Sequence, residues 1–399
     1  MATLKFKDAS PYTKPQPPPP IQDYLHQKYL DDIALKKNLR HPKVKVALFG
    51  IGRAGTIHLS NIIGSPRVKL VYIVEDVESK WNSLREYWQL DDVVFLNSKQ
   101  ADKVYNDPNV DAVIVTSPTY THEMIVRKSL ESQKAVFCEK PVAEDRLNTL
   151  KCYETAKKVG KPLFCAFNRR FDPSFALVRE RVRNGEVGHV HVIKTVARDS
   201  PLPTLDYLKN SGGIFHDCIV HDFDLITWVL GEYPIKQYIR YPDCKSLVAV
   251  QAYAHIPEIK EIGDYDTVLV SLFFPSGTLG MIDVARNSSY GYDQRLEVFG
   301  PKGMITVDNE RPVHSVTTQY GLQGPNKAPI WYTFSSRFMQ GYRRELDHFI
   351  NVVLGRAESS VLPQETLAVS KITSACEESA QTGKMVEINW TKDELPEIK

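Results

Sequence analysis

The sequence lacks a long apolar run, a strong excess of charge and the cysteine spacings of metal fingers. No uninterrupted apolar stretch approaches membrane-spanning length, and the first residues lack the apolar segment of a secretory signal. The 50 Lys and Arg residues nearly balance the 48 Asp and Glu residues, so the formal net charge is +2. This balance gives no electrostatic reason to expect nucleic acid or a membrane surface as a partner.

The six cysteines are scattered along the chain and include no CxxC pair. In a chain of 399 residues, 42% of them hydrophobic, such cysteines are typical of buried or free thiols in a reducing compartment. The length is sufficient for two domains, each with its own core. We therefore expect a soluble, cytoplasmic protein of two domains.

Residues 1–42 differ in composition from the rest of the chain. Pro11, Pro15 and the run 17–20 disfavour a helix or a central strand and favour an extended arm. Such an arm is either a disordered tail or a segment that packs on a neighbouring subunit. We expect a proline-rich arm over 1–42 and a short C-terminal tail over 391–399.

Short apolar runs alternate with helix-length segments between residues 43 and 167. The runs expected to form buried strands are 44–49, 68–74, 112–115, 135–138 and 163–167. The segments expected to form helices are 54–63, 78–88, 120–131 and 143–159. Continuous apolar strands that alternate with helices predict a parallel, doubly wound sheet.

The pattern changes after Phe167. Helical segments at 172–183 and 218–229 precede a strand-rich stretch from 233 to 318. Within that stretch, two apolar segments that flank Ser276-Gly277 predict a hairpin. The expected strands are 267–274, 278–284, 296–299 and 304–307, and the expected final helices are 338–353 and 364–381. This run of strands suggests an antiparallel sheet.

A complete GxGxxG motif follows the first strand and opens the first helix. In that context Gly50 permits a tight turn, Gly52 lets the backbone approach a pyrophosphate, and Gly55 lets the helix pack closely on the strand. The helix N-terminus then offers N–H groups and a positive dipole to the phosphates. The alternative is a glycine-rich loop without a ligand. The predicted pyrophosphate site consists of Gly50, Ile51, Gly52, Arg53, Ala54 and Gly55.

The second strand ends in Glu75-Asp76, where a carboxylate should accept hydrogen bonds from the ribose hydroxyls of a dinucleotide. We assign this role to Asp76. Two adjacent acids would also repel a 2′-phosphate, so NAD is favoured over NADP, although Arg53 could weaken that preference. Alternatively, both acids could form only a solvated strand end.

Two further clusters follow the ends of strands. Because ligands of open α/β sheets lie outside the carboxyl ends of the strands, both loops should face the nicotinamide. The expected cofactor contacts in them are Ser117, Pro118, His122 and Glu139. The ammonium of Lys140 could bind the reacting oxygen and stabilise alkoxide character. Otherwise Lys140 would be an ordinary surface lysine.

The segment from His216 to Asp222 is rich in histidine and aspartate. Asp217 and His221 are four residues apart and would share one face of a helix. Histidine is the usual base near neutral pH, and an adjacent carboxylate would orient it. A metal site is an alternative reading, but no further ligand at a recognisable spacing appears elsewhere, so we expect no metal. A second alternative is that these are structural helix histidines.

Together these motifs resemble the glucose–fructose oxidoreductase/inositol dehydrogenase/MocA family over about residues 43–390. The motifs that carry the resemblance are Gly50–Gly55 with His58, Pro118 with His122, Glu139-Lys140-Pro141, residues 168–173, and Asp217 with His221. Four more segments are similar to its inositol 2-dehydrogenase branch: 198–203, 207–215, 263–267 and 290–300.

The resemblance implies a Rossmann domain over 43–167 that binds NAD. It further implies a C-terminal α/β domain over 168–390 for substrate binding and oligomerisation. That domain would contain an open, mostly antiparallel sheet through which such enzymes often form dimers or tetramers. The implied reaction is oxidation of a cyclic polyol, most specifically of myo-inositol at its axial hydroxyl to the 2-inosose. The proline-rich arm departs from the short N-terminus of simple bacterial inositol dehydrogenases, which leaves the oligomeric arrangement open.

By the same resemblance, Lys140, Asp217 and His221 form a catalytic trio. His221 would take the hydroxyl proton, Lys140 would hold the oxygen, and Asp217 would orient His221 or a substrate hydroxyl. Secondary candidates for binding the polyol are Arg169, Asp199, Tyr290, Tyr292 and Asp293. Any of these could instead be structural, as an ion pair or as strand packing. The rival functions are an NAD(P)-dependent oxidoreductase of another sugar or dihydrodiol, and a non-catalytic NAD-binding regulator.

Overall fold

The computed structural model describes residues 43–234, 247–313, 315–322 and 324–391. From Val44 onward the chain forms one compact unit. The expected arm at 1–42, nearly all of the expected tail, and residues 235–246 of the strand-rich stretch lie outside the described residues.

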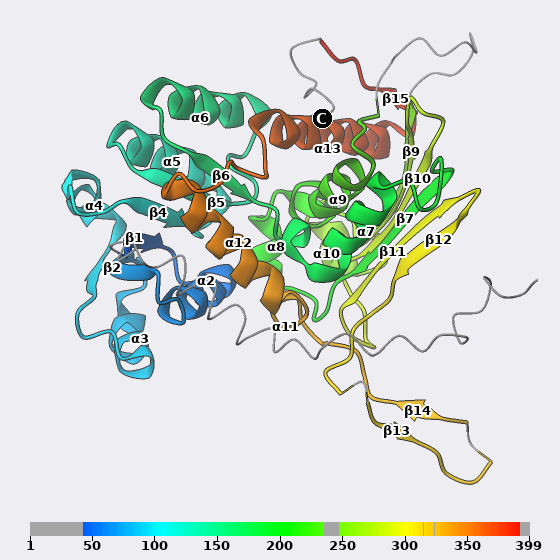
Figure 1. Cartoon of the computed structure of the whole chain (residues 1–399), viewed down its shortest axis with the longest axis horizontal. Helices are drawn as coiled ribbons and strands as arrows, with labels where there is room; N and C mark the ends of the chain where they lie inside the picture. Colours follow the sequence, from blue (N-terminus) through cyan, green and yellow to red (C-terminus); the bar gives the residue numbers. More distant parts are fainter. Residues whose placement is uncertain (1–42, 235–246, 314, 323, 392–399) are drawn as a thin grey trace, which may run out of the picture. The chain divides into compact units, whose positions relative to one another are not determined.

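Six parallel strands form the first sheet, in the order β3-β2-β1-β4-β5-β6 (Figure 1). The strands are β1 (Val44–Phe49), β2 (Val68–Val74), β3 (Val94–Leu96), β4 (Ala112–Val115), β5 (Ala135–Glu139) and β6 (Leu163–Ala166). This confirms the predicted doubly wound sheet. The strand order reverses between β1 and β4, and in such sheets the ligand crevice lies beyond the carboxyl ends of the strands at that point.

Helices pack on both sides of this sheet, with α5 and α6 on one side and α2 on the other (Figure 1). The helices of this part are α2 (Arg53–Ile63), α3 (Trp81–Trp88), α4 (Asp102–Asn106), α5 (His122–Glu131) and α6 (Arg146–Val159). The helices expected at 78–88 and 120–131 each begin with a 3₁₀ turn, η3 (Glu78–Lys80) and η5 (Thr119–Thr121). The short elements β3 and α4 were not expected, because so few residues show no measurable periodicity.

The second sheet has seven strands in the order β12-β11-β7-β10-β9-β8-β15. These are β7 (Val192–Arg198), β8 (Leu247–Tyr253), β9 (Thr267–Phe273), β10 (Leu279–Ala285), β11 (Asp293–Gly300), β12 (Gly303–Val307) and β15 (Val386–Glu387). Among these described strands, β7 and β10 pair in parallel and the other neighbours pair antiparallel. The prediction of a mostly antiparallel sheet is confirmed, with the β9–β10 hairpin at the expected place.

Helices cover one face of the second sheet. They include α7 (Pro173–Arg183), α9 (Val220–Leu230) and α13 (Pro363–Thr382), while α8 (Leu205–Lys209) and α10 (Pro257–Glu261) are short. The chain from β6 enters α7 through the 3₁₀ turn η6 (Asn168–Phe171), and a small hairpin, β13 (Thr317–Thr318) with β14 (Asn326–Lys327), precedes the last helices. The other face of the sheet carries exposed apolar side chains at Leu269, Leu279, Met281, Phe299 and Met304.

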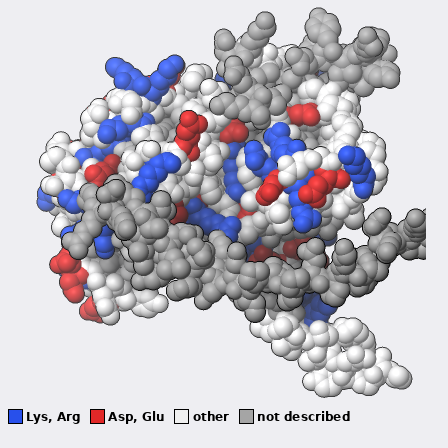
Figure 2. Space-filling view, in the orientation of Figure 1, with Lys and Arg blue, Asp and Glu red and all other residues white. Residues whose placement is uncertain are grey.

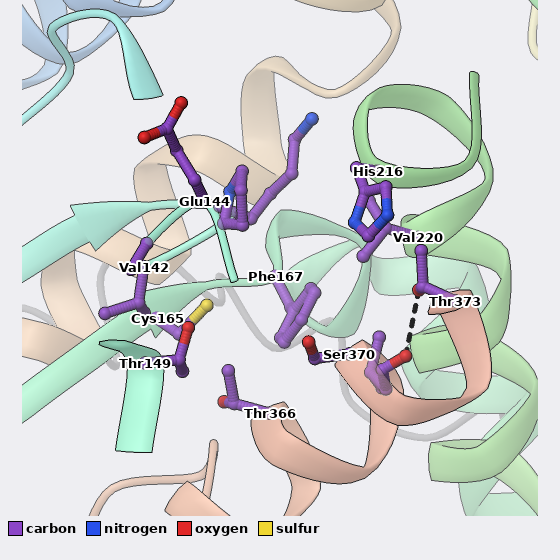
Figure 3. Close-up of a pocket in the computed structure, with 14 residues that line it drawn as sticks. Val142, Glu144, Thr149, Cys165, Phe167, His216, Val220, Thr366, Ser370 and Thr373 are labelled. Carbon is purple, nitrogen blue, oxygen red and sulfur yellow. Dashed lines mark hydrogen bonds between the residues drawn. The ribbon is translucent and has the colours of Figure 1, made fainter. Parts of the chain in front are cut away.

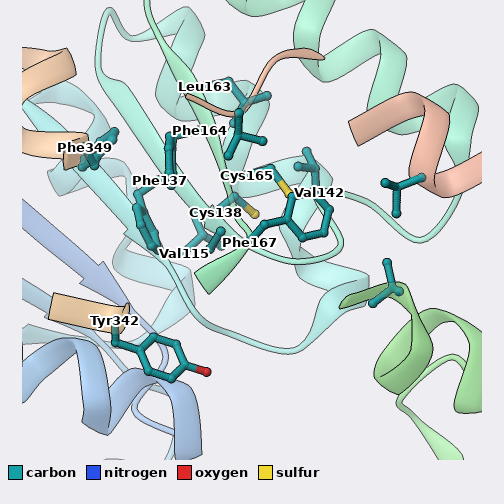
Figure 4. Packing of buried hydrophobic residues seen from close by; sticks show 14 of the residues in the cluster. Val115, Phe137, Cys138, Val142, Leu163, Phe164, Cys165, Phe167, Tyr342 and Phe349 are labelled. Atoms are coloured by element: carbon teal, nitrogen blue, oxygen red, sulfur yellow. The ribbon is translucent and has the colours of Figure 1, made fainter. Parts of the chain in front are cut away.

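The helix α12 (Met339–Val353) packs on the side of the first sheet. It follows the short helix α11 (Phe334–Arg337) and packs against α2 and η6, although it lies in the part of the chain expected to form the second domain. The Phe349 ring lies 5.5 Å from that of Phe137, and the Tyr342 ring lies 5.6 Å from that of His58. The buried cluster beneath β5 and β6 therefore includes side chains from α12 (Figure 4).

Candidate active site

The glycine-rich turn between β1 and α2 is shaped by close backbone contacts. Gly50 has a φ of +85°, and a Cβ added to it would lie 2.6 Å from the Cα of Ser117. A Cβ at Gly55 would lie 2.1 Å from the carbonyl oxygen of Gly50. By contrast, a Cβ at Gly52 would meet nothing within 4 Å. The turn therefore needs Gly50 and Gly55 for packing, whereas Gly52 faces open space.

The start of α2 is suited to an anion. Its N-cap, Gly52, has no side-chain cap, and its first turn contains no acidic residue. The first N–H groups of a helix have no intrahelical partner, so they and the helix dipole favour a phosphate here. The open space above Gly52 and this uncapped helix end fit the pyrophosphate of a dinucleotide, which residues 50–55 would hold.

The two acids at the end of β2 have different partners. Glu75 is buried, and its carboxylate accepts from the backbone N–H of Ile51 at 2.8 Å and of Val77 at 2.9 Å. Asp76 is exposed and accepts from the backbone N–H of Ser98 at 2.7 Å. Glu75 thus supports the glycine-rich turn, a role that the sequence did not indicate, and Asp76 remains the predicted ribose ligand.

The loops after β4 and β5 contact each other through a buried histidine. The two ring nitrogens of His122 lie 2.7 Å from the carbonyl oxygen of Pro141 and 2.8 Å from that of Ser117. The hydroxyl of Thr116 donates to the carbonyl oxygen of Gly50 at 2.7 Å, which joins the first loop to the glycine-rich turn. The segments that contain the predicted contacts Ser117, Pro118 and His122 therefore meet beside the turn.

Glu139 has a buried partner on α2. Its Oε1 lies 2.8 Å from Nε2 of His58, whose side chain is fully buried. The carboxyl group of Glu345 on α12 is also fully buried, and burial together with the charge of Glu139 raises its pKa well above the ordinary value. Burial of Glu345 therefore favours its neutral form, while Glu139 is held beside the predicted cofactor site.

Lys140 is not a surface lysine. Its ammonium donates to the backbone carbonyl of Asp217 at 2.6 Å and to Oδ1 of the same residue at 3.3 Å. The side chains of Lys140 and Asp217 are only 13% and 11% exposed. The structure thus brings together two members of the predicted trio that are far apart in the sequence.

Asp217 lies in a π-helical turn, η7 (Phe215–Ile219), that precedes α9. A helix over 218–229 was expected, and the structure differs because a π-helical turn, with i→i+5 hydrogen bonds, comes before α9 (Val220–Leu230). Besides Lys140, the carboxylate accepts from the hydroxyl of Tyr207 at 2.7 Å and from Arg286 at 3.1 Å. Burial alone would raise the pKa of Asp217, but the positive charges of Lys140 and Arg286 outweigh it and hold the pKa below its usual value. Asp217 is therefore ionised at neutral pH.

His221 lies on the first turn of α9. Burial, followed by the positive charges of Lys140 and Arg169, holds its pKa well below 6.5. The imidazole is consequently neutral at pH 7, the form that can accept a proton. Its Nδ1 is buried and has no hydrogen-bond partner within the described part of the chain.

The secondary candidates fall into two groups. Arg169 forms a buried ion pair with Asp222 at 2.9 Å, and the carboxylate of Asp199 accepts from the thiol of Cys218 at 3.2 Å. The charges of both Arg169 and Asp199 act on the buried hydroxyl of Tyr292. Asp199, Arg169 and Tyr292 therefore lie in the same region as Asp217.

Tyr290 and Asp293 belong to a different network. The hydroxyl of Tyr290 donates to Asp293 at 2.6 Å and accepts from Arg198 at 3.2 Å. Asp293 also accepts from Arg295 at 2.8 Å and 3.0 Å. The sequence motif that contains these two residues thus contributes Tyr292, rather than all three, to the neighbourhood of Arg169.

The side chains considered for a metal site have separate partners. Asp217 binds Lys140 and Arg286, Asp222 pairs with Arg169, and Nε2 of His216 lies 3.2 Å from Glu377. In the described ranges of the chain, no group of three or more His, Cys, Asp or Glu side chains could hold a metal ion.

Two residues that bind the carboxylate of Asp217 were not singled out from the sequence. Tyr207 was noted only as part of a family segment, and Arg286 was not considered. A signal for Arg286 was present, because it directly follows an apolar strand, the same position that drew attention to Lys140. Tyr207 also contacts the cofactor turn, since the guanidinium of Arg53 lies 4.2 Å from the centre of its ring.

A pocket lies beside the Lys140 loop, between η7 and α13 (Figure 3). It spans about 400 Å³, including space that is open to solvent, and His216 and Thr373 line the side opposite Val142 and Thr149. Lys140 lines this pocket, whereas Asp217 and His221 do not, so the pocket adjoins the Lys140–Asp217 pair from the Lys140 side.

Charges are mixed on one face of the described protein. On the face drawn in Figure 2, basic and acidic side chains are interspersed. None of the helices in the described residues is long and apolar enough to cross a membrane.

Comparison with known proteins agrees with this arrangement. The chain is 38% identical to a myo-inositol 2-dehydrogenase of Thermotoga maritima over 311 residues, which are 78% of this chain and 88% of that protein. It is 32% identical to a scyllo-inositol 2-dehydrogenase (NAD(+)) of Bacillus subtilis, over 78% of this chain and 86% of that one. The crystal structure of a myo-inositol dehydrogenase from Corynebacterium glutamicum aligns with a TM-score of 0.77 at 32% identity, covering 88% of this chain and all of that one.

Two family descriptions cover most of the chain. Residues 44–167 match "Oxidoreductase family, NAD-binding Rossmann fold", and residues 179–388 match "Oxidoreductase family, C-terminal alpha/beta domain". The resemblance inferred from the motifs is thereby confirmed, and the chain belongs to the glucose–fructose oxidoreductase/inositol dehydrogenase/MocA family of oxidoreductases.

Proposed function

We propose that the protein oxidises a cyclic polyol, with myo-inositol as substrate and 2-inosose as product, and passes the hydride to NAD. The names of relatives that share 32–38% of its residues support an inositol as substrate. The observation that carries the proposal is the cluster of Lys140, Asp217 and a neutral, buried His221. A non-catalytic regulator would not require a buried lysine, a paired carboxylate and a neutral imidazole in one place.

In the proposed reaction NAD supplies the hydride acceptor, and the protein's own residues manage the proton and the oxygen. His221 takes the proton of the reacting hydroxyl while the C–H electron pair leaves the same carbon as hydride. The carbon–oxygen double bond forms as both leave. The ammonium of Lys140 donates to the reacting oxygen and stabilises its developing negative charge, which is worth most in a site that excludes water. Asp217 keeps that ammonium in place through its carbonyl and its carboxylate.

We assign the remaining polyol hydroxyls to Asp199 and Tyr292. The charge of Arg169 acts on both of these side chains. Burial and the charge of Asp217 raise the pKa of Asp199, and its carboxyl oxygens can accept hydrogen bonds from polyol hydroxyls. Tyr290 and Asp293 are weaker candidates than the sequence suggested, because their hydrogen bonds go to each other and to arginines of the sheet.

We infer that the cofactor is NAD rather than NADP. Glu75 and Asp76 place two carboxylates at the end of β2, where a 2′-phosphate would be repelled. Glu75 is already committed to the backbone of Ile51 and Val77, which leaves the exposed Asp76 as the group to meet the ribose. One of the relatives above has NAD(+) in its name.

We also infer a homo-oligomer in a reducing compartment such as the cytoplasm. The exposed apolar residues on the open face of the second sheet include Leu269, Leu279 and Met281 on neighbouring strands, which suits contact with a second copy. The described cysteines, Cys138, Cys152, Cys165, Cys218 and Cys376, are free thiols. Light scattering of the purified protein would test the oligomer.

The proposed function is tested by following NADH formation with myo-inositol, scyllo-inositol, common aldoses and a dihydrodiol in parallel, each with NAD and with NADP. Reduction of NAD that depends on an inositol, and is weak with NADP, is the expected result. Activity confined to an aldose or to the dihydrodiol would replace the substrate and keep the reaction. No turnover with any of them, while NAD still binds, would favour the regulator.

A further inference from the structure

Arg286 is the largest fully buried side chain of the described protein. It directly follows β10, and its guanidinium bridges two carboxylates. One nitrogen lies 3.1 Å from Oδ2 of Asp217 and the other lies 3.0 Å from Oδ2 of Asp264. A buried guanidinium is stable only when paired in this way, so the bridge fixes the position of both carboxylates.

The bridge is anchored at both of its ends. The backbone N–H of Arg286 donates to the carbonyl of Asp266 at 2.8 Å. The other carboxylate oxygen of Asp264 accepts from the backbone N–H of Ile214 at 3.0 Å, just before the π-helical turn that contains Asp217. Arg286 therefore joins the end of a rigid strand to the irregular turn on which Asp217 lies. π-Helical turns are frequent at functional sites because they displace one side chain from the regular helix.

The two oxygens of Asp217 face different groups. Arg286 binds Oδ2, which leaves Oδ1 to Lys140 and to the hydroxyl of Tyr207. Rotation of the carboxylate would break the bond to Arg286, so Oδ1 stays directed at the ammonium. The geometry of the Lys140–Asp217 pair is thus set in part from a residue that does not touch Lys140.

The charges around Asp217 make Arg286 important for its ionisation. The titratable and charged groups that face Asp217 are Lys140, Arg286, Tyr207, Cys218 and Asp199. Asp264 binds the other side of the Arg286 guanidinium. Only Lys140 and Arg286 of these are cationic. Without Arg286, a single cation would oppose the cost of burial and the neighbouring carboxyl of Asp199.

We propose that Arg286 is a positioning residue that keeps Asp217 ionised and directed at Lys140 during the reaction. The inference rests on the proposed function, because the role of the Lys140–Asp217 pair in turnover comes from it. Arg286 neither donates to the reacting oxygen nor moves a proton. Its effect passes through Asp217.

The first test compares Arg286→Gln with Arg337→Gln as a matched control. Arg337 is also almost fully buried and pairs with Asp172 at 2.6 Å, and within the described residues it has no hydrogen bond or ion pair with Lys140 or Asp217. We expect Arg286→Gln to lower kcat/KM at pH 8 by about tenfold, with a deficit that widens as the pH is lowered toward 5, because Asp217 then takes up a proton. NADH affinity should stay within about twofold of wild type in both variants, and Arg337→Gln should keep the wild-type pH profile. A wild-type pH profile in Arg286→Gln, or the same widening deficit in Arg337→Gln, would overturn the proposal.

Two further variants keep the test decisive if Arg286→Gln does not fold. Arg286→Lys keeps the charge but cannot bridge two carboxylates with a planar fork, so it should lose turnover without the widening deficit at low pH. Asp264→Asn leaves Arg286 to Asp217 alone and should hold Asp217 ionised to the same or lower pH. If Asp264→Asn loses activity at low pH as Arg286→Gln is expected to, the electrostatic role is wrong.

A measurement without turnover separates this inference from the proposed function. We expect Arg286→Gln and Asp217→Asn to be non-additive in the urea midpoint of unfolding, because the two side chains bind each other. If wild type reduces NAD with none of the polyols but the two substitutions are coupled, the proposed function fails while the linkage of Arg286 to Asp217 stands. Additive effects would refute the linkage even in an active enzyme.

Discussion

Lys140 donates to two oxygens of one residue, the backbone carbonyl of Asp217 at 2.6 Å and its carboxylate at 3.3 Å. The first of these bonds depends on the course of the chain and the second on the ionisation of the side chain. A lysine held in this way has lost most of its rotamer freedom before substrate arrives. In the proposed reaction its ammonium would therefore be preorganised for an oxygen that becomes negative only as the hydride leaves.

Replacement of this lysine should separate chemistry from cofactor binding. We expect Lys140→Met to lower kcat by about a hundredfold or more, because the group that stabilises the oxygen is lost. NADH affinity, measured by fluorescence titration, should change by less than about threefold, since the glycine-rich turn is untouched. The matched control is Lys134→Met, because Lys134 is also buried and donates to the carbonyls of Asp107 and Val110 at 2.7 Å and 3.1 Å. Near-normal turnover in Lys140→Met, or an equal loss in Lys134→Met, would contradict the assigned role.

His221 should determine how activity falls in acid. Its pKa lies well below 6.5, so the imidazole is neutral and competent as a base down to that lowered pKa, and wild-type kcat/KM should fall only below pH 6.5. His221→Gln should lower kcat by about a hundredfold and remove this acid limb from the profile. The pH dependence of kcat/KM from pH 5 to 9 is the measurement.

The same histidine predicts a dependence of stability on pH. Below about pH 6.5 the unfolded chain takes up a proton at His221 that the folded protein does not, so the free energy of unfolding should decrease as the pH falls. His221→Gln should reduce that decrease. His348→Gln is the control, because burial also lowers the pKa of His348, whose Nε2 accepts from the backbone of Ser360 at 3.0 Å. His348→Gln should change the dependence of stability on pH and leave the pH profile of kcat/KM as in wild type. If the fall of kcat/KM in acid survives in His221→Gln, another group is the base.

The sequence predicted the parts of the site that follow directly from strand ends. The turn at Gly50–Gly55 and the position of Lys140 could be anticipated, because parallel strands bring their carboxyl ends to one edge. The bridge from Arg286 to Asp217 could not, because it depends on how β10 of the second sheet meets a π-helical turn. The packing of α12 against α2 was also out of reach, since an apolar helix face does not reveal which of two sheets it will cover.

Tyr290 and Asp293 show a limit of a different kind. Tyr290 lies in a turn before β11, and Gly291 has a φ of +125°, so residues 290–292 do not continue the strand that begins at Asp293 and their side chains do not follow its alternation. Tyr292 is buried near Arg169, whereas Tyr290 and Asp293 bind each other. The motif identifies the segment, and the local backbone geometry decides which of its side chains lies near Arg169.

Asp76 should control the choice between the two nicotinamide cofactors. It is exposed at the end of β2, while Glu75 is held by the backbone of Ile51 and Val77. We expect Asp76→Ser to raise the ratio of kcat/KM with NADP to that with NAD by about tenfold or more, because a repelling charge is removed from the 2′-phosphate. Glu86→Gln removes an exposed acid from the nearby helix α3 and should leave the ratio unchanged. An unchanged ratio in Asp76→Ser would transfer the ribose contact to another group.

The same substitution at two glycines of one turn should have very different effects on the free energy of unfolding. A Cβ at Gly55 would lie 2.1 Å from the Gly50 carbonyl oxygen, so Gly55→Ala must displace α2 from β1 and should lower the free energy of unfolding by about 3 kcal/mol. A Cβ at Gly52 would meet nothing within 4 Å, and its φ of −86° is accessible to alanine. Gly52→Ala should therefore change the free energy of unfolding by less than about 1 kcal/mol.

The effect of Gly52→Ala on the cofactor should nevertheless be large. The space into which its methyl group would project is the space proposed for the pyrophosphate, so NADH affinity should fall by about tenfold or more, equivalent to about 1.4 kcal/mol. Urea unfolding and fluorescence titration of both variants give the two quantities separately. If Gly52→Ala binds NADH as wild type does, the open space above the helix end is not where the phosphates lie. If Gly55→Ala is as stable as wild type, the close contact with Gly50 does not constrain the turn.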